Sequence, residues 1–512
     1  MNNQPKNNPP RDGKEISLWQ SNVVKPEITD IPHHYICDVV IVGGGITGIT
    51  TALLLQQQGK KCIIAEGRTI GFGTTGGTSA HLNTFFDATY PDVEQDFGKD
   101  SAKLLAQAGK EAISTINCLI EQYHIQCDFE LKDAFLFSEN EKESKQLEKI
   151  LKASVAAGIQ ASQENDNGLP MSFDMSVLFK NQGQFHPLKY IYKLAEVFTK
   201  LGGIILENTF IKENTYEKGV HIVQSEKARI KADHLVFATH IPPGITPLNF
   251  TCAPYRSYVL GVQLKDGQYP DHLIYDMKEP YHYFRSHIIN RQTFLLVGGE
   301  DHKTGHSNPE TAFKNLEEYV RKYFSVSSID YKWSSQYYIP ADGLPYIGQA
   351  PASDENIYIA TGFNGNGMIF GTLSAQIISD QIMGTDNIYT DLFSPSRIKP
   401  IAGFTDFVKE NADVAYRFLA DRFSVEELDS LEVIEPEQGI IAELNGKKLA
   451  IYKDQQGHIT ALNPVCSHAG CIVQFNNIEK SWDCPCHGAR YDVNGEVLTG
   501  PARNNLKKHT PN

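Results

Sequence analysis

The sequence has no apolar run as long as about 18 residues, and its 512 residues include only 3 tryptophans. Because a transmembrane helix needs about 20 consecutive apolar residues, these absences indicate a globular protein that does not span a membrane. Basic residues do not outnumber acidic ones, and the net charge of −14 argues against binding to nucleic acid or to anionic membrane surfaces. The first fourteen residues lack the apolar core of a signal peptide, so we expect a disordered start and a cytoplasmic protein.

Cysteine is scarce as well, but four of the 9 cysteines fall between positions 466 and 486. This stretch contains a Cys-x-His loop, with Cys466 and His468, and a Cys-x-x-His loop, with Cys484 and His487. A Rieske 2Fe–2S centre binds one iron through two Cys and the other through two His, and here each loop offers one ligand of each kind. A zinc site usually groups a Cys pair before a His pair, so a Cys2His2 zinc knuckle remains as the alternative.

The two loops resemble those of the Rieske proteins of cytochrome bc complexes. The resemblance implies a disulfide between Cys471 and Cys486 that clamps the loops, although disulfides are unusual in a reducing compartment. In that family a Ser and a Tyr after the last His ligand donate hydrogen bonds to the cluster sulfurs. Tyr491 is present here, but Ala489 stands at the Ser position, so we expect a reduction potential below that of respiratory Rieske proteins. Residues 500–502, Gly-Pro-Ala, resemble the loop that covers the cluster.

The N-terminal third carries the signature of a second cofactor. Residues 37–42 form an apolar run typical of a buried strand, residues 49–58 have a helical pattern, and residues 61–65 form a second apolar strand. Between the first strand and the helix, residues 43–48 read Gly-Gly-Gly-Ile-Thr-Gly. A Gly-x-Gly-x-x-Gly turn in this context predicts a dinucleotide-binding βαβ unit.

Each glycine has its own role in such a unit. Gly43 permits the tight turn, Gly45 lets the backbone approach the pyrophosphate, and Gly48 lets the helix and the strand pack closely. The N-terminus of the helix presents free N–H groups and a positive dipole end to the phosphates. Glu66, 23 residues after Gly43, is placed to bind the ribose hydroxyls.

Residues 37–384 resemble the superfamily of D-amino-acid oxidase and glycine oxidase, which implies FAD as the cofactor. The order of the segments carries the resemblance: a hydroxyl-rich loop at 73–80, a strand at 235–239, an Asp-Gly-Leu-Pro run at 342–345 and a Gly-rich turn at 362–368. The N–H groups of that turn would face the pyrimidine edge of the flavin. The resemblance adds these positions to the FAD site: Arg68, Thr75, Gly77, Thr78, Gly362, Gly365, Gly367 and Met368.

The length and the motifs predict several domains. We expect an N-terminal segment (1–35), an FAD-dependent oxidoreductase (36–400), a helical connector (401–424) and a small all-β Rieske domain (425–512). The oxidoreductase is predicted as an α/β Rossmann-like FAD-binding domain with an interleaved α+β substrate domain. The FAD-binding parts cover about 36–90, 180–245 and 336–385, and the substrate or cap parts cover about 91–179 and 246–335.

The sequence says less about the substrate site. Oxidases of the superfamily commonly bind the substrate carboxylate through an Arg between a Trp and the Asp-Gly-x-Pro run, and Tyr337 takes that position here. A free α-amino acid is therefore less favoured than a neutral or cationic amine or a bulkier molecule. Tyr283 and Arg285 are candidates for polar contacts, with a sheet face bearing a surface Arg as the alternative. Residues 300–302, Glu-Asp-His, could line the same cavity, but a polar turn after a strand is favoured. No general base is nominated.

These observations predict an FAD-dependent oxidoreductase, a dehydrogenase or oxidase, that acts on a small amine or amino-acid derivative. Electrons would pass from the flavin to the Rieske cluster and on to an unknown acceptor. The alternatives are reverse flow, in which a partner donates electrons through the cluster, and a non-enzymatic electron carrier or redox sensor. A Rieske oxygenase is disfavoured, because its mononuclear iron needs two His and a carboxylate in a separate domain, and that region is flavin-like here.

Overall fold

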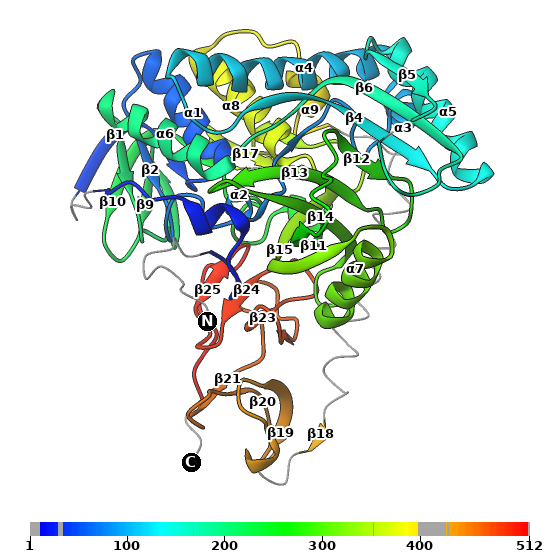
Figure 1. The fold of residues 1–512 in the computed structure, drawn as a ribbon. Coiled ribbons are helices and arrows are strands. Elements are labelled where there is room, and N and C mark those ends of the chain that lie inside the picture. The colour runs from blue at the N-terminus through cyan, green and yellow to red at the C-terminus, as the bar shows by residue number, and fades with distance from the viewer. Residues whose placement is uncertain are drawn as a thin grey trace.

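The computed structural model describes residues 11–28, 34–166, 168–351, 353–397, 426–427 and 431–509 (Figure 1). The predicted helical connector and the first ten residues lie outside these described residues. The described chain divides into a large N-terminal part (residues 11–397) and a C-terminal part (residues 426–509). No helix in the described ranges is both long and apolar enough to cross a membrane.

A first sheet in the N-terminal part has parallel strands at its centre, in the order β17, β10, β1, β2, β7. Residues 39–42 of β1 and all of β2 are buried, as expected for parallel strands covered on both faces. The predicted strand–turn–helix–strand unit at residues 37–65 is therefore confirmed. The strands of this sheet are β1 (His34–Val42), β2 (Cys62–Ala65), β7 (Ile204–Leu206), β8 (Glu213–Glu217), β9 (Val220–Gln224), β10 (Arg229–Phe237), β16 (Tyr346–Gln349) and β17 (Ile357–Thr361).

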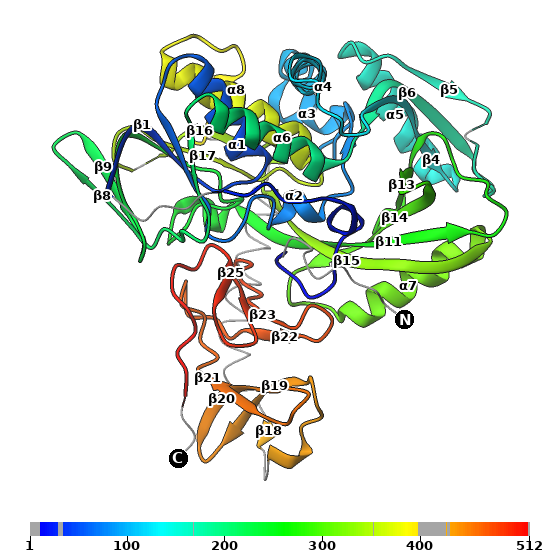
Figure 2. The ribbon, with the colours of Figure 1, turned by 60° about the vertical axis from the view of Figure 1, so that its left-hand side comes forward.

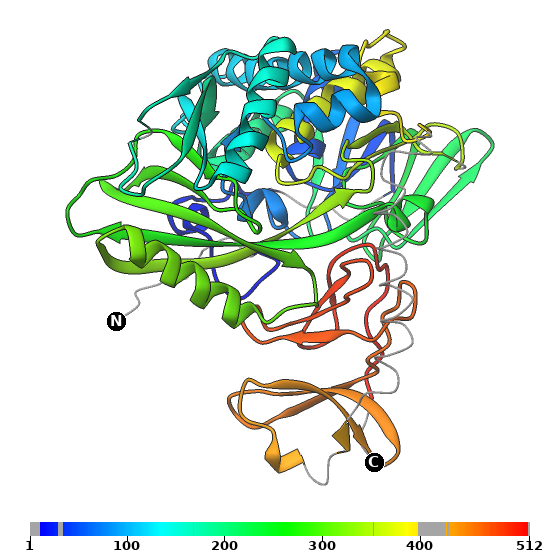
Figure 3. The ribbon, with the colours of Figure 1, turned by 90° about the vertical axis from the view of Figure 1, so that its right-hand side faces the viewer.

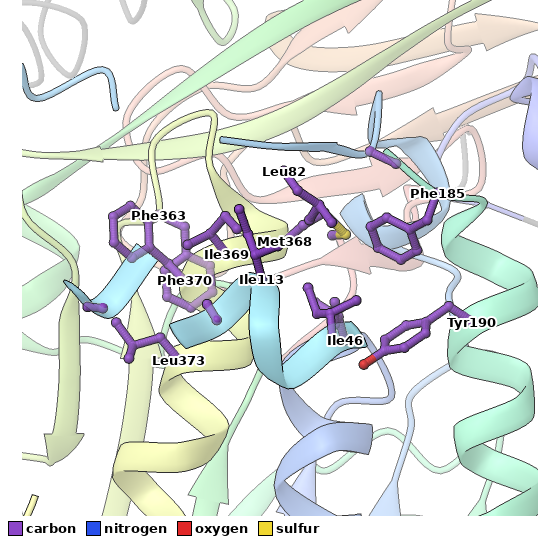
Figure 4. Packing of buried hydrophobic residues seen from close by; sticks show 14 of the residues in the cluster. Ile46, Leu82, Ile113, Phe185, Tyr190, Phe363, Met368, Ile369, Phe370 and Leu373 are labelled. Atoms are coloured by element: carbon purple, nitrogen blue, oxygen red, sulfur yellow. The ribbon is translucent and has the colours of Figure 1, made fainter. Parts of the chain in front are cut away.

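Helix α1 (Ile46–Gln57) packs between α6 (Pro187–Lys200) and α8 (Gly367–Met383), and α4 (Lys99–Gln122) packs on α8. Helices α1 and α8 are apolar nearly all round, because both are enclosed by other elements. Figure 4 shows the side chains that meet at the start of α8, among them Ile46, Ile113 and Phe370, all of them buried. This packing fixes the N-termini of α1 and α8 relative to each other.

A second, larger sheet runs in the order β15, β11, β14, β13, β12, β4, β6, β3, with β5 paired to β6. Its strands are β3 (His81–Leu82), β4 (Glu130–Ser138), β5 (Ala161–Glu164), β6 (Met175–Gln184), β11 (Cys252–Leu264), β12 (Leu273–Asp276), β13 (Tyr283–Ile289), β14 (Gln292–Lys303) and β15 (Val326–Pro340). The remaining helices are α2 (Thr74–Gly77), α3 (Tyr90–Phe97), α5 (Glu141–Ala156), α7 (Pro309–Tyr323) and α9 (Thr390–Phe393), with 3-10 turns η1 (Leu18–Asn22), η2 (Pro247–Phe250) and η3 (Leu431–Val433). The sequence favoured a polar turn at residues 300–302, but in the structure these residues continue strand β14.

The C-terminal part consists of two four-stranded sheets, which confirms the predicted all-β class. The outer sheet contains β18 (Glu426–Glu427), β19 (Gly439–Leu444), β20 (Lys447–Lys453) and β21 (Ile459–Leu462), and the inner sheet contains β22 (Gln474–Asn476), β23 (Ser481–Asp483), β24 (Arg490–Asp492) and β25 (Val497–Thr499). Figures 2 and 3 show the inner sheet between the outer sheet and the N-terminal part. The inner sheet carries the second cysteine–histidine loop, between β23 and β24.

A buried ionic cluster joins the two parts of the chain. Arg490 pairs with Asp12 at 2.9 Å and with Asp483 at 3.0 Å. Glu479 pairs with Arg256 and with Arg11, each at 3.5 Å. Three cations thus meet three anions, and none of the six residues is more than 5% exposed. Arg11 and Asp12 fall within the polar start that was predicted to be disordered, and their pairing with the C-terminal part accounts for their burial.

Removing one cation from this cluster should destabilise the protein strongly. We expect Arg490→Met to lower the free energy of unfolding by about 3–5 kcal/mol, because Asp483 would remain buried without its cation and Asp12 would keep only Arg11. The measurement is the urea midpoint of the full chain. Lys14→Met is the matched control: the pair Lys14–Glu437 is partly exposed, so its loss should change the free energy by less than about 1 kcal/mol. Equal losses of unfolding free energy for the two substitutions would contradict the proposed contribution of the cluster to stability.

Candidate functional site

A cavity of about 440 Å³ lies where the two large sheets of the N-terminal part meet. At one end it is lined by residues 43–47, the turn between β1 and α1, and by residues 66–68 after β2. At the other end it is lined by side chains from strands β12 to β15 and by the start of α8. The cavity therefore runs from the carboxyl ends of the parallel strands of the first sheet to the second, larger sheet.

The glycine turn has the geometry that its predicted roles require. Gly43 has a φ of +113°, and a Cβ there would lie 2.4 Å from the carbonyl oxygen of Ala238. A Cβ on Gly48 would lie 2.0 Å from the Gly43 carbonyl oxygen, so Gly48 packs against the turn and does not line the cavity. Gly45 caps the N-terminus of α1 and does line it. The free N–H groups of α1 are thereby turned toward the cavity.

Glu66 lines the same end of the cavity, directly after β2. Its carboxylate accepts hydrogen bonds from the backbone N–H of Gly44 at 2.6 Å and of Arg68 at 2.7 Å. Burial raises the pKa of Glu66, and these two N–H groups oppose that rise. The acid is therefore held in place beside the glycine turn, as a ribose-binding group must be.

The other predicted cofactor positions lie around the cavity with one exception. Gly362 is not among the lining residues: its φ is +74°, and a Cβ there would lie 3.0 Å from Pro340, so it serves the turn that leads into α8. The hydroxyl of Thr75 accepts a hydrogen bond from the N–H of Ile46 at 3.1 Å, which ties the hydroxyl-rich loop to α1. The lining positions among those predicted are Gly43, Gly45, Glu66, Arg68, Thr75, Gly77, Thr78, Gly365, Gly367 and Met368.

The two cysteine–histidine loops come together in the C-terminal part. The rings of His468 and His487 lie 4.9 Å apart, and the thiols of Cys466 and Cys484 are close enough to interact. This interaction with Cys484 is the main cause that lowers the pKa of Cys466 to about 7. The disulfide Cys471–Cys486, predicted from the resemblance, is present and joins the two loops.

The ring nitrogens of the two histidines fit a metal site. His487 has both nitrogens buried without a hydrogen-bond partner among the described residues, and the Nδ1 of His468 is in the same state. Buried polar atoms without partners are uncommon in proteins, and a bound metal would account for one nitrogen of each ring. The sulfurs of Cys471, Cys484 and Cys486 lie within 4.8 Å of one another, but the disulfide leaves only Cys484 of these three as a ligand.

The histidine loops dock against the wall of the cavity. The Nε2 of His468 lies 3.1 Å from the carbonyl oxygen of Gly244, in the loop after β10. The hydroxyl of Tyr338 donates to the backbone oxygen of His487 at 3.2 Å, and Gln336 Nε2 donates to that of Gly488 at 2.9 Å. Tyr338 and Gln336 belong to β15 and also line the cavity. One short stretch of strand thus contacts both sites.

Comparison with known proteins identifies both parts. Residues 38–381 match the family described as FAD dependent oxidoreductase. The chain belongs to that family. Residues 425–510 match the Rieske [2Fe-2S] domain, so this FAD-dependent oxidoreductase carries a Rieske domain at its C-terminal end.

The similar proteins agree with this assignment. The chain is 31% identical to the Rieske 2Fe-2S iron-sulfur protein YhfW of Bacillus subtilis (strain 168), over 96% of this chain and 97% of YhfW. It is 24% identical to gamma-glutamylputrescine oxidoreductase of Escherichia coli (strain K12), over 68% of this chain and 84% of that protein. The crystal structure of glycine oxidase from Geobacillus kaustophilus shares the fold, with a TM-score of 0.61 and 17% identity over 71% of this chain and 99% of that one.

The residues that line the two sites fit both cofactors of this FAD-dependent oxidoreductase. The cradle formed by Gly43, Gly45 and Glu66 at the N-terminus of α1 suits a dinucleotide, and the start of α8 suits the flavin ring. Cys466, His468, Cys484 and His487 would hold the 2Fe–2S cluster, and the unpartnered ring nitrogens fit that role. When bound, FAD supplies two-electron chemistry and the cluster supplies one-electron transfer.

The hydrogen bond from Tyr491 should set part of the cluster potential. The Tyr491 hydroxyl lies 3.2 Å from the Sγ of Cys466, while Ala489 is fully buried and donates no side-chain hydrogen bond. Because hydrogen bonds to the sulfurs stabilise the reduced cluster, we expect Tyr491→Phe to lower its midpoint potential and Ala489→Ser to raise it, each by on the order of 60 mV. EPR-monitored redox titration measures both shifts. A potential that does not move in either variant would contradict this prediction.

Of the three predicted substrate contacts, two line the cavity. Tyr283 and Tyr337 do so, but Arg285 does not. Arg285 is completely buried, and its guanidinium donates to the backbone oxygens of Ser79 and Ala80, at 2.8 Å each. Arg285 was therefore wrongly predicted as a substrate contact. Because its guanidinium binds these two carbonyl groups, it supports the hydroxyl-rich loop and is not free to bind a substrate.

Asp301 lines the cavity, whereas the sequence favoured a polar turn for residues 300–302. Its Oδ2 accepts a hydrogen bond from the Tyr337 hydroxyl at 2.8 Å, and its Oδ1 has no partner among the described residues. Burial raises the pKa of this carboxyl to about 7. Asp87, across the same cavity, accepts a hydrogen bond from the N–H of Gly365 at 2.6 Å.

The substrate end of the cavity is acidic and aromatic. Its acidic side chains are Asp87, Asp276, Glu279 and Asp301, of which Asp276 pairs with His282 at 2.9 Å. Its tyrosines are Tyr275, Tyr281, Tyr283 and Tyr337. Lys278 is the lysine that lines this end, and its ammonium pairs with Glu139 at 2.9 Å, so it is already neutralised. Carboxylates together with aromatic faces favour a cation in this space and disfavour a carboxylate.

Proposed function

We propose that this FAD-dependent oxidoreductase oxidises a small cationic amine that lacks a carboxylate, and that the electrons pass from FAD to the Rieske cluster and then to an external acceptor. The observation that carries the proposal is the docking of the histidine loops. Tyr338 and Gln336 line the flavin cavity and donate hydrogen bonds to the backbone of His487 and Gly488. The two cofactor sites therefore share a wall, which favours electron transfer within one chain.

The composition of the cavity supports the amine. Tyr337 replaces the Arg that binds a substrate carboxylate in amino-acid oxidases of the superfamily, and it donates its hydrogen bond to Asp301. The unpartnered Oδ1 of Asp301 can accept a hydrogen bond from a substrate ammonium group. The name of one relative, gamma-glutamylputrescine oxidoreductase, describes a compound derived from an amine. That name is consistent with an amine as the substrate class, but its glutamyl group carries a carboxylate, so the name gives no support to the absence of one.

The acidic cavity supports the forward direction of electron flow. It offers a place for a reduced organic substrate next to the flavin ring. The cluster loops are buried against the N-terminal part, with His487 only 3% exposed, which favours exchange of electrons with the flavin site. An external acceptor then takes electrons from the cluster.

The test is an anaerobic substrate panel on the purified holoprotein. Mono- and diamines without a carboxylate are compared with their α-amino-acid counterparts, and loss of flavin absorbance and the EPR signal of the reduced cluster are recorded. We expect both signals to change with amines and neither to change with amino acids. Reduction by amino acids alone, or reduction of the cluster only by an added protein donor, would overturn the proposal.

A further inference from the structure

Residues 497–503 of the Rieske domain, here called the wall segment, lie between the two cofactor sites. Leu498, Thr499, Gly500 and Ala502 line the flavin cavity of the N-terminal part. On its other side the wall segment belongs to the apolar cluster that contains the ligand cysteines. Val497 and Ala502 are members of that cluster and are 4% and 1% exposed. One segment therefore borders both sites, and Ala502 contacts both.

Hydrogen bonds from the N-terminal part hold the wall segment in this position. Arg68 Nη2 donates to the backbone oxygen of Val497 at 2.7 Å. The N–H of Gly244 donates to the backbone oxygen of Pro501 at 2.9 Å. These contacts come from the segments after β2 and after β10, and of the two residues Arg68 also lines the cavity, at the end where Glu66 lies.

A third contact runs in the opposite direction. Arg503 Nη2, from the wall segment, donates to the backbone oxygen of Pro243 at 3.0 Å. Arg503 is not among the residues that line the cavity. It can therefore affect a ligand in the cavity only by holding the wall segment in its docked position.

We infer that the wall segment is part of the FAD-binding site and closes the cavity at the end where Glu66 and Arg68 lie. A dinucleotide site of this fold is ordinarily an open crevice at the carboxyl ends of the strands, and here a second domain covers it. Because the same segment packs on the ligand cysteines, FAD binding and an intact docked Rieske domain stabilise each other, and this linkage is reciprocal. The inference concerns FAD binding alone and is independent of the substrate and of the direction of electron flow.

The direct test is Leu498→Asp in the full-length protein. FAD is removed and then titrated back, and the dissociation constant is read from flavin fluorescence while the cluster is quantified by EPR. We expect the dissociation constant to rise by about tenfold or more, since the substitution removes apolar contact and adds a negative charge to a cavity that must hold a diphosphate. Val493→Asp is the matched control, because Val493 is also a partly buried residue of the Rieske domain but does not line the cavity. An unchanged dissociation constant in Leu498→Asp, with a full cluster signal, would overturn the inference.

A second measurement keeps the inference testable if Leu498→Asp fails to assemble its cluster. In the wild-type protein, saturating FAD should slow the loss of iron to a chelator several-fold, and Arg503→Met should reduce this protection while it leaves the lining of the cavity unchanged. Equal rates of iron loss with and without FAD in the wild-type protein would overturn the inference.

Discussion

His487→Leu is expected to abolish the EPR signal of the reduced 2Fe–2S cluster and to reduce turnover with a one-electron acceptor by about 100-fold or more, since even residues that only support metal ligands cost 10- to 100-fold. Both ring nitrogens of His487 are buried without partners among the described residues, so the metal is the interaction that the substitution removes. Loss of flavin absorbance on adding substrate anaerobically should persist, because the glycine turn and Glu66 are untouched.

The control is His458→Leu, in the outer sheet region of the same Rieske domain. His458 is exposed and pairs with Asp454 at 2.9 Å, so its loss should leave the cluster and turnover unchanged. Iron analysis accompanies EPR for both variants. A wild-type protein that contains zinc and no iron, or a His487→Leu variant that retains the full Rieske signal, would contradict the ligand assignment.

Asp301→Asn is expected to reduce kcat/KM for a cationic amine by about 10- to 100-fold, because a hydrogen bond to a charged group contributes roughly 1.5–3 kcal/mol. Asparagine keeps the shape and the acceptor for the Tyr337 hydroxyl but removes the negative charge. Asp330→Asn is the control: Asp330 is an exposed acid on β15, and its loss should leave kcat/KM unchanged. Equal kcat/KM for wild type and Asp301→Asn would show that Asp301 does not bind the ammonium group.

The pH dependence of the same variant adds a second check. Burial raises the pKa of Asp301 to about 7, so its carboxylate forms as the pH rises through 7, and kcat/KM of the wild type should increase over that range. The native state holds this proton to a higher pH than the unfolded chain, so Asp301 stabilises the fold at low pH, and this stabilisation is lost as the pH rises through about 7. We therefore expect Asp301→Asn to lack the increase in kcat/KM. It should also melt at a higher temperature than the wild type at pH 8, with the difference vanishing toward pH 4.

The cofactor sites could be predicted from sequence because their residues are local. The four cluster ligands fall within two short loops, and the glycine turn, its helix and Glu66 follow one another along 24 residues. Spacing alone then restricts the chemistry, since few structures other than a Rieske centre place one Cys and one His in each of two loops. The FAD assignment needed the order of later segments as well, because the glycine turn does not distinguish FAD from NAD.

The residues at the substrate end could be predicted less accurately. The alternation along a strand shows on which face of the sheet a side chain lies, but not whether it reaches the cavity. Tyr283 and Arg285 share a face of β13, yet Tyr283 lines the cavity while the guanidinium of Arg285 reaches the backbone of Ser79 and Ala80. At Asp301 the alternation itself is interrupted: Glu300 has a φ of +57°, and the register between β11 and β14 shifts nearby. Such a bulge changes the direction of the following side chain, and no residue type in the sequence predicts it.

The contact between the two domains was also beyond sequence reasoning. Arg490 and Asp12 are 478 positions apart, and Asp12 lies in a polar start whose composition indicates disorder. Composition describes how a segment behaves alone, whereas Asp12 is held by a cation from the far end of the chain. The shared wall formed by Tyr338 and residues 497–503 depends on this docking.

We propose that substrate electrons reach the Rieske cluster within a single chain by way of the flavin site. Rapid freeze-quench EPR combined with stopped-flow absorbance, after anaerobic mixing of the holoprotein with its amine, tests this route most directly. We expect flavin absorbance to fall first and the reduced-cluster signal then to rise at a rate independent of protein concentration. A cluster that stays oxidised after the flavin absorbance is lost, or one that is reduced at a rate proportional to protein concentration, would contradict it.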